Sequence, residues 1–359
     1  MPSADGRVVK GLEMRDEGAG RGERVVVLST MGFPEDWLAR LRAVSPRLEV
    51  VQRTARAVEE VPDEVWAGID VLYTGVTFPE VGRAPRLRWV QLDTSGVDHV
   101  MTTPLWATDV EITTLNGVAP VNMAEFAVMM MLAFGHRLNL MFAHQLRREW
   151  PSPAERWDRF MPSELRGATV GIVGYGSIGR EIGRVAHALG MRVLGLRRAG
   201  TKQGETYRVA ALAATAETQP DRMYLPDQLG EMLAACDYVV LTVPYTPETR
   251  HMVDAAALRA MKPTAVLINI SRGGVVEETA LIQALREGWI AGAALDVFEE
   301  EPLPPDSPLW ATTNVVISPH VAGFTPRYHE DVMGIFSENL RRFLVGRPLL
   351  NRVDRASGY

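Results

Sequence analysis

The stretch ATVGIVGYGSIG, residues 168–179, joins an apolar run typical of a buried strand to a glycine-rich turn, and a helical pattern follows it. In such a turn Gly174 permits the sharp bend, and Gly176 lets a ligand approach the backbone. Gly179 allows the helix to pack closely on the strand, and the start of the helix attracts an anion. The pattern therefore predicts a site for the pyrophosphate of a dinucleotide. Its candidate binding residues are Gly174, Gly176, Ser177, Ile178 and Gly179.

The rest of the chain repeats this alternation of strand-like runs and helical patterns, which predicts α/β architecture with parallel sheets. A length of 359 residues exceeds one typical core and predicts two domains. Strands are expected at 24–28, 48–52, 70–73, 88–92, 111–115, 168–173, 192–196, 238–242, 265–270, 292–296 and 315–317. Helices are expected over 37–44, from about 122 to 150 with a break near Gly135, and over 327–345.

Three segments depart from the alternation. Residues 1–23 mix glycine with both charge signs and lack an apolar run, which predicts a flexible leader and not a signal peptide. Residues 151–164 carry three prolines and predict a connection. Residues 200–224 are polar and irregular, and we interpret them as a surface insertion.

Composition excludes several classes of protein. The net charge of −6 gives no basic surface for nucleic acid. Cys236 is the only cysteine, which excludes an internal disulfide and fits a cytoplasmic location. No metal-ligand spacing is present, so no metal is expected. The most hydrophobic stretch, 126–134, is about half of the roughly 20 residues that a membrane span needs, so a buried helix is expected and no membrane partner.

Arg197 and Arg198 follow the strand predicted at 192–196, where a dinucleotide fold often carries an acid for the ribose 2′-hydroxyl. Arginine can instead hydrogen-bond a 2′-phosphate through its planar fork. The pair therefore predicts a preference for NADP(H). NAD(H) stays open as the cofactor, since both side chains could simply face solvent.

Three distant segments supply side chains suited to reducing a keto acid. Arg272 follows a predicted strand, and the carboxyl ends of such strands form the ligand-binding edge of a sheet. A guanidinium can hold a carboxylate and polarise the neighbouring ketone. His320 is the natural proton donor near neutral pH, and a neighbouring carboxylate favours the imidazolium and fixes the ring. Glu301 is the candidate for that carboxylate, but Glu299 and Glu300 compete, and spacing alone leaves the choice open.

Residues from about 70 to 345 resemble the D-isomer-specific 2-hydroxyacid dehydrogenases, a family that includes glyoxylate/hydroxypyruvate reductases and phosphoglycerate dehydrogenases. The matching stretches are LRG at 165–167 before the glycine-rich turn, TVPYTPETR at 242–250, SRG at 271–273, DVF at 296–298 before EP at 301–302, PHVAG at 319–323, TSGVD at 94–98, NGVAP at 116–120 and NMAEF at 122–126. Arg197 departs from the pattern, because the family often has aspartate there.

The resemblance implies a role for each matched residue. It selects Glu301 as the partner of His320 and implies that Asp296 holds the nicotinamide carboxamide. The further cofactor-binding residues that it implies are Val243, Pro244, Thr249, Ile270 and Ser271. The residues that it implies for the substrate carboxylate are Thr94, Ser95, Gly96 and Val97, together with Arg272.

The resemblance also implies a topology, in which a Rossmann cofactor domain is inserted into a flavodoxin-like substrate domain. Residues 24–120 and 326–359 would form the discontinuous substrate domain, and residues 121–325 the dinucleotide-binding domain with the interdomain helices. Family members usually dimerise through the cofactor domains. The apolar side chains that could form this interface, or equally ordinary core, are Leu138, Leu140, Met141 and Phe142. Trp150 and Trp157 sit where a dimer arm could reach the partner's substrate pocket.

Together these observations predict a cytoplasmic, homodimeric oxidoreductase that prefers NADP(H) and reduces a small 2-keto acid, such as glyoxylate or hydroxypyruvate, to the D-2-hydroxy acid. One alternative is a phosphoglycerate-type or other D-2-hydroxyacid dehydrogenase that uses NAD. Another is a binding protein that senses dinucleotides, although the intact arginine, glutamate and histidine set argues against it.

Overall fold

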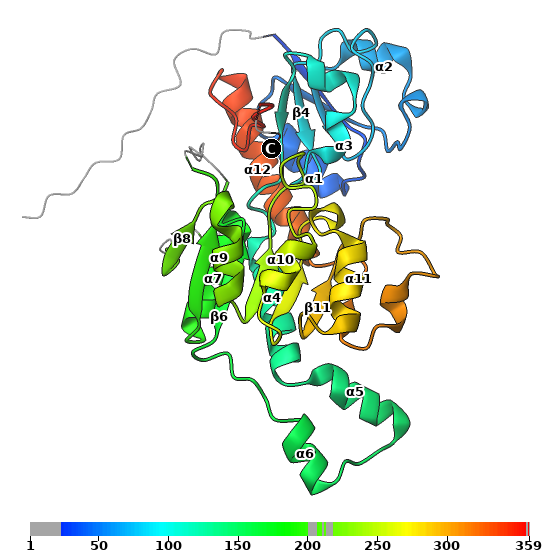
Figure 1. The fold of residues 1–359 in the computed structure, drawn as a ribbon. Helices are drawn as coiled ribbons and strands as arrows, with labels where there is room; N and C mark the ends of the chain where they lie inside the picture. Colours follow the sequence, from blue (N-terminus) through cyan, green and yellow to red (C-terminus); the bar gives the residue numbers. More distant parts are fainter. Residues whose placement is uncertain (1–22, 200–206, 210–211, 213–217, 357, 359) are drawn as a thin grey trace, which may run out of the picture.

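The computed structural model describes residues 23–199, 207–209, 212, 218–356 and 358, which form two α/β domains, each built around a parallel sheet (Figure 1). The strands of the first sheet are β1 (Val25–Ser29), β2 (Leu48–Gln52), β3 (Val71–Thr74), β4 (Trp89–Leu92) and β5 (Glu111–Thr113). Those of the second are β6 (Thr169–Val173), β7 (Arg192–Leu196), β8 (Arg222–Tyr224), β9 (Tyr238–Leu241), β10 (Val266–Asn269), β11 (Gly292–Leu295) and β12 (Val315–Ile317).

The strand orders confirm the predicted fold class. The five-stranded sheet has the order β2-β1-β3-β4-β5, which is the flavodoxin-like arrangement. The seven-stranded sheet has the order β12-β11-β10-β9-β6-β7-β8, in which β6 and β9 flank the point where the winding reverses, as in a Rossmann fold. Ligands of such sheets bind at that point, outside the carboxyl ends of the strands.

Helices cover both sheets, as buried parallel strands require (Figure 1). In the first part of the chain they are α1 (Glu35–Arg42), α2 (Asp63–Gly68), α3 (Asp98–Met101), α4 (Pro120–Gly135), α5 (Leu138–Arg147) and α6 (Pro153–Arg159). After these come α7 (Ser177–Ala188), α9 (Leu229–Ala235), α10 (Ala255–Ala260), α11 (Glu278–Glu287) and α12 (Tyr328–Leu344).

Helix α12 returns from the seven-stranded domain to complete the core of the five-stranded one. Phe336 and Leu340 are fully buried against that sheet. The Phe336 ring lies 5.6 Å from Trp89 of β4 and 5.0 Å from Tyr73 of β3. The last long helix of the chain therefore packs on the first strands, and the chain crosses between the domains twice.

The break predicted near Gly135 separates α4 from α5, which meet at an angle of 63°. Arg137, at the junction, has a left-handed backbone with φ of 58°. Within the described residues, no single helix is long and apolar enough to cross a membrane, and only the bent α4–α5 pair has the length and composition. Much of α4 is buried in the core of the seven-stranded domain, whereas α5 and α6 extend away from it (Figure 1).

Two expectations about irregular segments were wrong in part. The predicted connection 151–164 contains α6, because Pro153 fits the first helical turn and the Ser152 hydroxyl caps it by accepting the Glu155 backbone N–H at 3.2 Å. The predicted insertion 200–224 ends in β8, which adds an edge strand to the sheet beside β7. The remaining residues of that insertion are described only at 207–209, 212 and 218–221, and the predicted leader lies outside the described residues apart from Glu23.

Candidate active site

The turn that carries Arg272 is held by a buried amide from the end of β10. Asn269 is 1% exposed, and its Oδ1 accepts hydrogen bonds from the Ser271 backbone N–H at 3.1 Å and the Ser271 hydroxyl at 2.7 Å. Its Nδ2 donates to the Arg272 carbonyl at 3.0 Å. Gly273 comes so close to the next loop that a methyl group there would overlap the Phe298 carbonyl carbon. Arg272 thus projects from the carboxyl edge of the sheet, and the 296–301 loop packs directly against its turn.

His320 and Glu301 form a direct pair. His320 Nδ1 lies 2.7 Å from Glu301 Oε2, and the other Glu301 oxygen accepts the Phe298 backbone N–H at 3.0 Å. The competing Glu299 is engaged elsewhere, because its Oε1 lies 2.8 Å from His251 Nε2. The structure therefore resolves the choice that spacing left open in favour of Glu301. Because Nδ1 of His320 faces Glu301, Nε2 is the ring nitrogen that faces away from this carboxylate.

Asp296 organises the turn on which His320 stands. Its carboxylate is 2% exposed and accepts the Ser318 hydroxyl at 2.7 Å, the Val321 N–H at 2.9 Å and the Ala322 N–H at 2.9 Å. The His320 N–H also donates to the Asp296 carbonyl at 2.9 Å. These bonds hold His320 in a left-handed backbone conformation with φ of 55°. The expected contact of Asp296 with a nicotinamide carboxamide stays a prediction.

The glycine-rich turn at the end of β6 has the shape that a dinucleotide needs. Gly174 has φ of 101°, and a methyl group there would lie 2.8 Å from the Val243 backbone nitrogen, so the ends of β6 and β9 nearly touch. A methyl at Gly179 would lie 2.5 Å from the Gly174 carbonyl oxygen, which shows why helix α7 can pack so close. A methyl at Gly176 would meet none of the described atoms within 4 Å. The turn is thus tight on the protein side and open on the ligand side, and it fits a pyrophosphate at the start of α7.

The other residues expected around the cofactor border this turn. Val243 and Pro244 follow β9, beside Gly174, and the Thr249 hydroxyl donates to the Pro244 carbonyl at 2.7 Å and so closes the loop. Ile270 is buried at the end of β10. The Ser177 hydroxyl, at the first turn of α7, donates to Asn116 Oδ1 of the interdomain segment at 2.7 Å. These residues line one continuous edge of the seven-stranded sheet.

Arg197 and Arg198 follow β7, next to the strand that leads into the glycine-rich turn. The backbone N–H of Arg197 donates to the Tyr224 carbonyl of β8 at 3.2 Å, so the edge strand that the sequence did not reveal fixes this position. The Arg197 side chain is exposed, and Arg198 is half-buried. A hydrogen bond from the Thr246 side chain lowers the pKa of the nearby Glu248 carboxyl, and the charge of Arg198 adds a smaller effect in the same direction.

The loop at residues 94–97 reaches the site from the other domain. The Thr94 hydroxyl donates to the Gly96 carbonyl at 2.8 Å, and the Leu115 N–H donates to the Thr94 carbonyl at 2.9 Å. A methyl group at Gly96 would overlap Arg272 Nη2. The structure therefore brings together the loop and the arginine that the sequence placed in one site, although they come from different domains.

Asp93, which precedes this loop, was not expected to take part. The hydroxyls of Tyr73 and Tyr328 both donate to its Oδ1, and Tyr328 also donates to the Asp93 carbonyl oxygen at 2.9 Å. Burial raises the pKa of the Asp93 carboxyl above its ordinary value. Nothing in the local sequence pairs these residues, since Tyr328 begins α12, more than 200 positions later.

The two crossings between the domains are fastened to each other. Asn122 Nδ2, at the start of α4, donates to the carbonyls of Ala322 at 2.8 Å and Phe324 at 3.0 Å, which belong to the segment after His320. Asn351 Nδ2, in the segment after α12, donates to the carbonyl of Asn116 at 2.6 Å and so ties the C-terminal segment to the stretch just before the first crossing. Both crossings therefore meet beside the catalytic edge.

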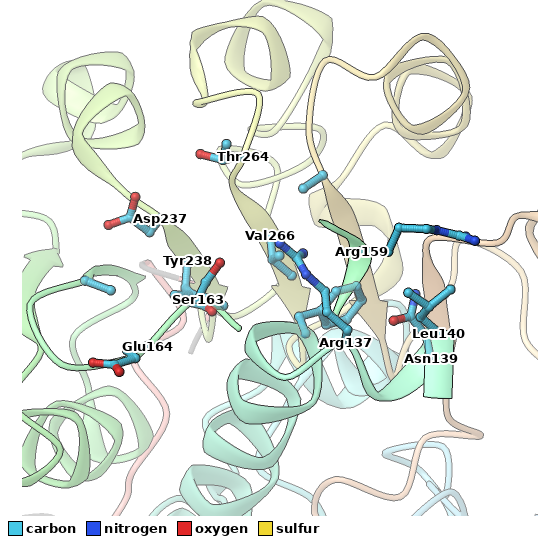
Figure 2. Close-up of a pocket in the computed structure, with 13 residues that line it drawn as sticks. Arg137, Asn139, Leu140, Arg159, Ser163, Glu164, Asp237, Tyr238, Thr264 and Val266 are labelled. Carbon is cyan, nitrogen blue, oxygen red and sulfur yellow. The ribbon is translucent and has the colours of Figure 1, made fainter. Parts of the chain in front are cut away.

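A separate pocket lies at the opposite edge of the seven-stranded sheet (Figure 2). Tyr238 and Val266, which begin β9 and β10, line it together with Arg137 and Leu140 at the α4–α5 junction. Since the residues expected to do chemistry sit at the carboxyl ends of the same strands, this pocket is not part of their site.

Comparison with known proteins adds to this geometry. Residues 128–322 match the family described as D-isomer specific 2-hydroxyacid dehydrogenase, NAD binding domain. The chain is 35% identical over 339 residues to a glyoxylate reductase of Thermococcus onnurineus, which covers 90% of this chain and 97% of that protein. The chain belongs to the D-isomer specific 2-hydroxyacid dehydrogenase family. It is an NAD(P)-dependent D-2-hydroxyacid dehydrogenase.

Solved structures of this dehydrogenase family have the same fold. A D-isomer specific 2-hydroxyacid dehydrogenase from Xanthobacter autotrophicus Py2, in complex with NADPH and MES, is 30% identical with a TM-score of 0.76, and the match covers 94% of this chain and 100% of that one. An NADPH-dependent glyoxylate/hydroxypyruvate reductase from Sinorhizobium meliloti, in complex with NADP and sulfate, is 28% identical with a TM-score of 0.74 and the same coverage. The recognition of the family from its motifs is thereby confirmed.

Proposed function

We propose that this dehydrogenase reduces a small 2-keto acid, such as glyoxylate or hydroxypyruvate, to the D-2-hydroxy acid and prefers NADPH. The observation that carries the proposal is the His320–Glu301 pair, 2.7 Å apart at the sheet edge that also carries Arg272. The names of the glyoxylate and glyoxylate/hydroxypyruvate reductases support a small substrate. The NADPH and NADP complexes of the two structural relatives support the cofactor.

In this mechanism the 94–97 loop and Arg272 bind the substrate carboxylate, and the guanidinium also polarises the adjacent ketone. A nicotinamide dinucleotide bound at the glycine-rich turn would supply the hydride for C2. His320 donates a proton from Nε2 to the substrate oxygen as it gains negative charge. Glu301 fixes the ring by holding Nδ1, so that Nε2 stays directed toward the substrate.

The preference for NADPH rests on the two arginines after β7. A 2′-phosphate bound there would meet Arg197, whose side chain is exposed and whose backbone is fixed by β8. No acid stands at position 197 to repel it. Charge-assisted hydrogen bonds of this kind contribute about 1.5–3 kcal/mol each.

The domain boundaries and the assembly belong to the same proposal. We assign residues 24–120 and 326–359 to the substrate domain and 121–325 to the dinucleotide-binding domain. Closure of one on the other would exclude water from the hydride path. We place the enzyme in the cytoplasm, where its single cysteine, fully buried, would stay reduced.

We further propose that two copies associate through the dinucleotide-binding domains. Leu138, Met141 and Phe142 are 39%, 42% and 53% exposed on α5, a helix that extends away from the domain (Figure 1). Their exposure favours an interface over ordinary core. Trp150 is 86% exposed near α6, where it could enter the partner's substrate pocket. Sedimentation should give a dimer, and Trp150→Ala should change the ratio of kcat/KM values among 2-keto acids. A monomeric enzyme, or an unchanged ratio, would contradict this part.

The main test is a panel of 2-keto acids, including glyoxylate, hydroxypyruvate and phosphohydroxypyruvate, measured with NADPH and with NADH. We expect the highest kcat/KM with glyoxylate or hydroxypyruvate and NADPH. Faster turnover of the phosphorylated acid with NADH would support the phosphoglycerate alternative. Cofactor binding without turnover of any acid would support a dinucleotide-sensing role.

Loss of the proton donor tests the mechanism itself. His320→Ala should lower kcat by about 10²–10⁴-fold while NADPH binding stays the same. His251→Ala is the matched control, because it removes another histidine paired with a glutamate, 2.8 Å away, outside the proposed site. Wild-type turnover in His320→Ala would assign the proton donor to another group.

A further inference from the structure

An ion pair between Asp98 and Arg272 connects the two domains inside the site. Asp98 follows the 94–97 loop and begins α3, whereas Arg272 follows β10 of the other sheet. Arg272 Nε donates to Asp98 Oδ1 at 3.3 Å, and the two side chains are 31% and 35% exposed. In this structure Asp98 is thus the carboxylate that is bound to Arg272.

The three nitrogens of the guanidinium face three different groups. Nε is bound to Asp98, and Nη1 donates to the Ser271 carbonyl at 2.9 Å. Nη2 lies against Gly96, where an added methyl would overlap it and would also lie 2.8 Å from Asp98 Oδ1. The ion pair and the Ser271 bond therefore direct the remaining nitrogen at the backbone of the 94–97 loop.

The charge of Asp98 has no second cation in the same turn. His99 is its neighbour, but burial lowers the pKa of the His99 imidazole by more than the charge of Asp98 raises it. Its Nε2 is buried and lacks a hydrogen-bond partner among the residues that the structure describes. Arg272 is therefore the cation that pairs with Asp98 in this structure.

We propose that Asp98 is a positioning residue, which holds Arg272 with Nη2 against the 94–97 loop and so completes the binding site for the substrate carboxylate when the two domains meet. This inference rests on the proposed function. Two effects of Asp98 oppose each other: its charge repels an anionic substrate, while its contact orients the guanidinium that binds that substrate. A bound and fixed arginine loses less conformational freedom when the substrate arrives, so the orienting effect outweighs the repulsion.

Whether Asp98→Asn raises or lowers the KM for glyoxylate separates the two effects. Asp98→Asn keeps the shape and removes the charge, and we expect the KM for glyoxylate to rise about tenfold, the loss of roughly one charge-assisted contact, while kcat changes less and the KM for NADPH stays the same. A KM for glyoxylate that falls or stays equal would overturn the proposal. Asp63→Asn is the matched control, because Asp63 pairs with Arg83 at 2.7 Å within the five-stranded domain and should leave all three constants unchanged.

A double-mutant cycle tests whether Asp98 acts through Arg272. In an Arg272→Lys background, Asp98→Asn should change the KM for glyoxylate much less than in the wild type. Equal fold-changes in the two backgrounds would show that Asp98 acts independently and would overturn the proposal.

A readout without turnover keeps the inference separate from the proposed function. The rate at which phenylglyoxal modifies the peptide containing Arg272, followed by mass spectrometry, should be several-fold higher in Asp98→Asn than in the wild type. An unchanged rate would refute the ion pair as the element that holds Arg272. Wild-type enzyme that turns over none of the 2-keto acids would refute the proposed function instead.

Discussion

Replacing Glu301 by glutamine tests how much of the activity depends on the charge beside His320. The substitution keeps the side-chain shape and an oxygen for the Phe298 N–H, but it changes a charged hydrogen bond of 2.7 Å into a neutral one. Charged hydrogen bonds contribute about 1.5–3 kcal/mol and neutral ones about 0.5–1.5, so the expected loss is about 1–1.5 kcal/mol. At about 1.4 kcal/mol per factor of ten, kcat/KM for glyoxylate with NADPH should fall roughly tenfold.

A control variant is available at Glu299, two residues before Glu301. Glu299→Gln removes the same charge from a comparable pair, in which Glu299 lies 2.8 Å from His251. Because Glu299 also accepts the Glu278 N–H at the start of α11, we expect a change in thermal stability and wild-type turnover. The assay is initial-rate oxidation of NADPH by each purified variant. Equal losses in both variants, or no loss in Glu301→Gln, would refute the role assigned to Glu301.

Three further predictions follow from contacts described above. Arg197→Ser should lower kcat/KM for NADPH by about tenfold or more, as the loss of one charge-assisted contact implies, and leave that for NADH unchanged; equal effects on the two cofactors would contradict a contact with the 2′-phosphate. Gly273→Ala should cost about 3 kcal/mol and lower the Tm by about 6–12 °C, because its methyl would overlap the Phe298 carbonyl; an unchanged Tm in calorimetry would show that the two loops separate easily. Asp93→Asn should gain stability relative to the wild type as the pH rises from about 4 to the raised folded-state pKa of Asp93, and the difference should stay constant above it, since burial raises that pKa above 3.8 and the ionised carboxyl destabilises the fold. Melting curves across the acid range would show a constant difference if Asp93 were not the titrating group.

Most of the fold could be predicted from the sequence because buried parallel strands are continuous apolar runs. The strand β8 was missed, since Arg222–Tyr224 is a three-residue edge strand at the end of a polar segment and has little apolar signal of its own. Helix α6 was missed because its prolines were interpreted as breakers, although Pro153 stands at the first helical turn behind a serine cap.

The site, like the fold, could be predicted only in part. The sequence placed Arg272 after a predicted strand and grouped it with Glu301 and His320 by their chemistry and by the family resemblance. In the structure the three residues follow β10, β11 and β12. Spacing could not separate Glu301 from Glu299, because only the position of His251 in space decides which acid is engaged elsewhere. The roles of Asn269 and Asp93 were also missed, since each depends on hydrogen bonds that form only when the loops have packed.

The contacts of Asn122 restrict how the two halves of the molecule can move. Asn122 stands on the first crossing, and its side-chain amide binds Ala322 and Phe324 of the second, so sliding one crossing along the other would break both bonds at once. A swing about an axis through that amide preserves them. We therefore expect domain opening and closure to be chiefly a rotation at this junction, which moves Gly96 toward and away from the Arg272 guanidinium. Crystals of this enzyme grown with and without ligand should differ mainly by that rotation.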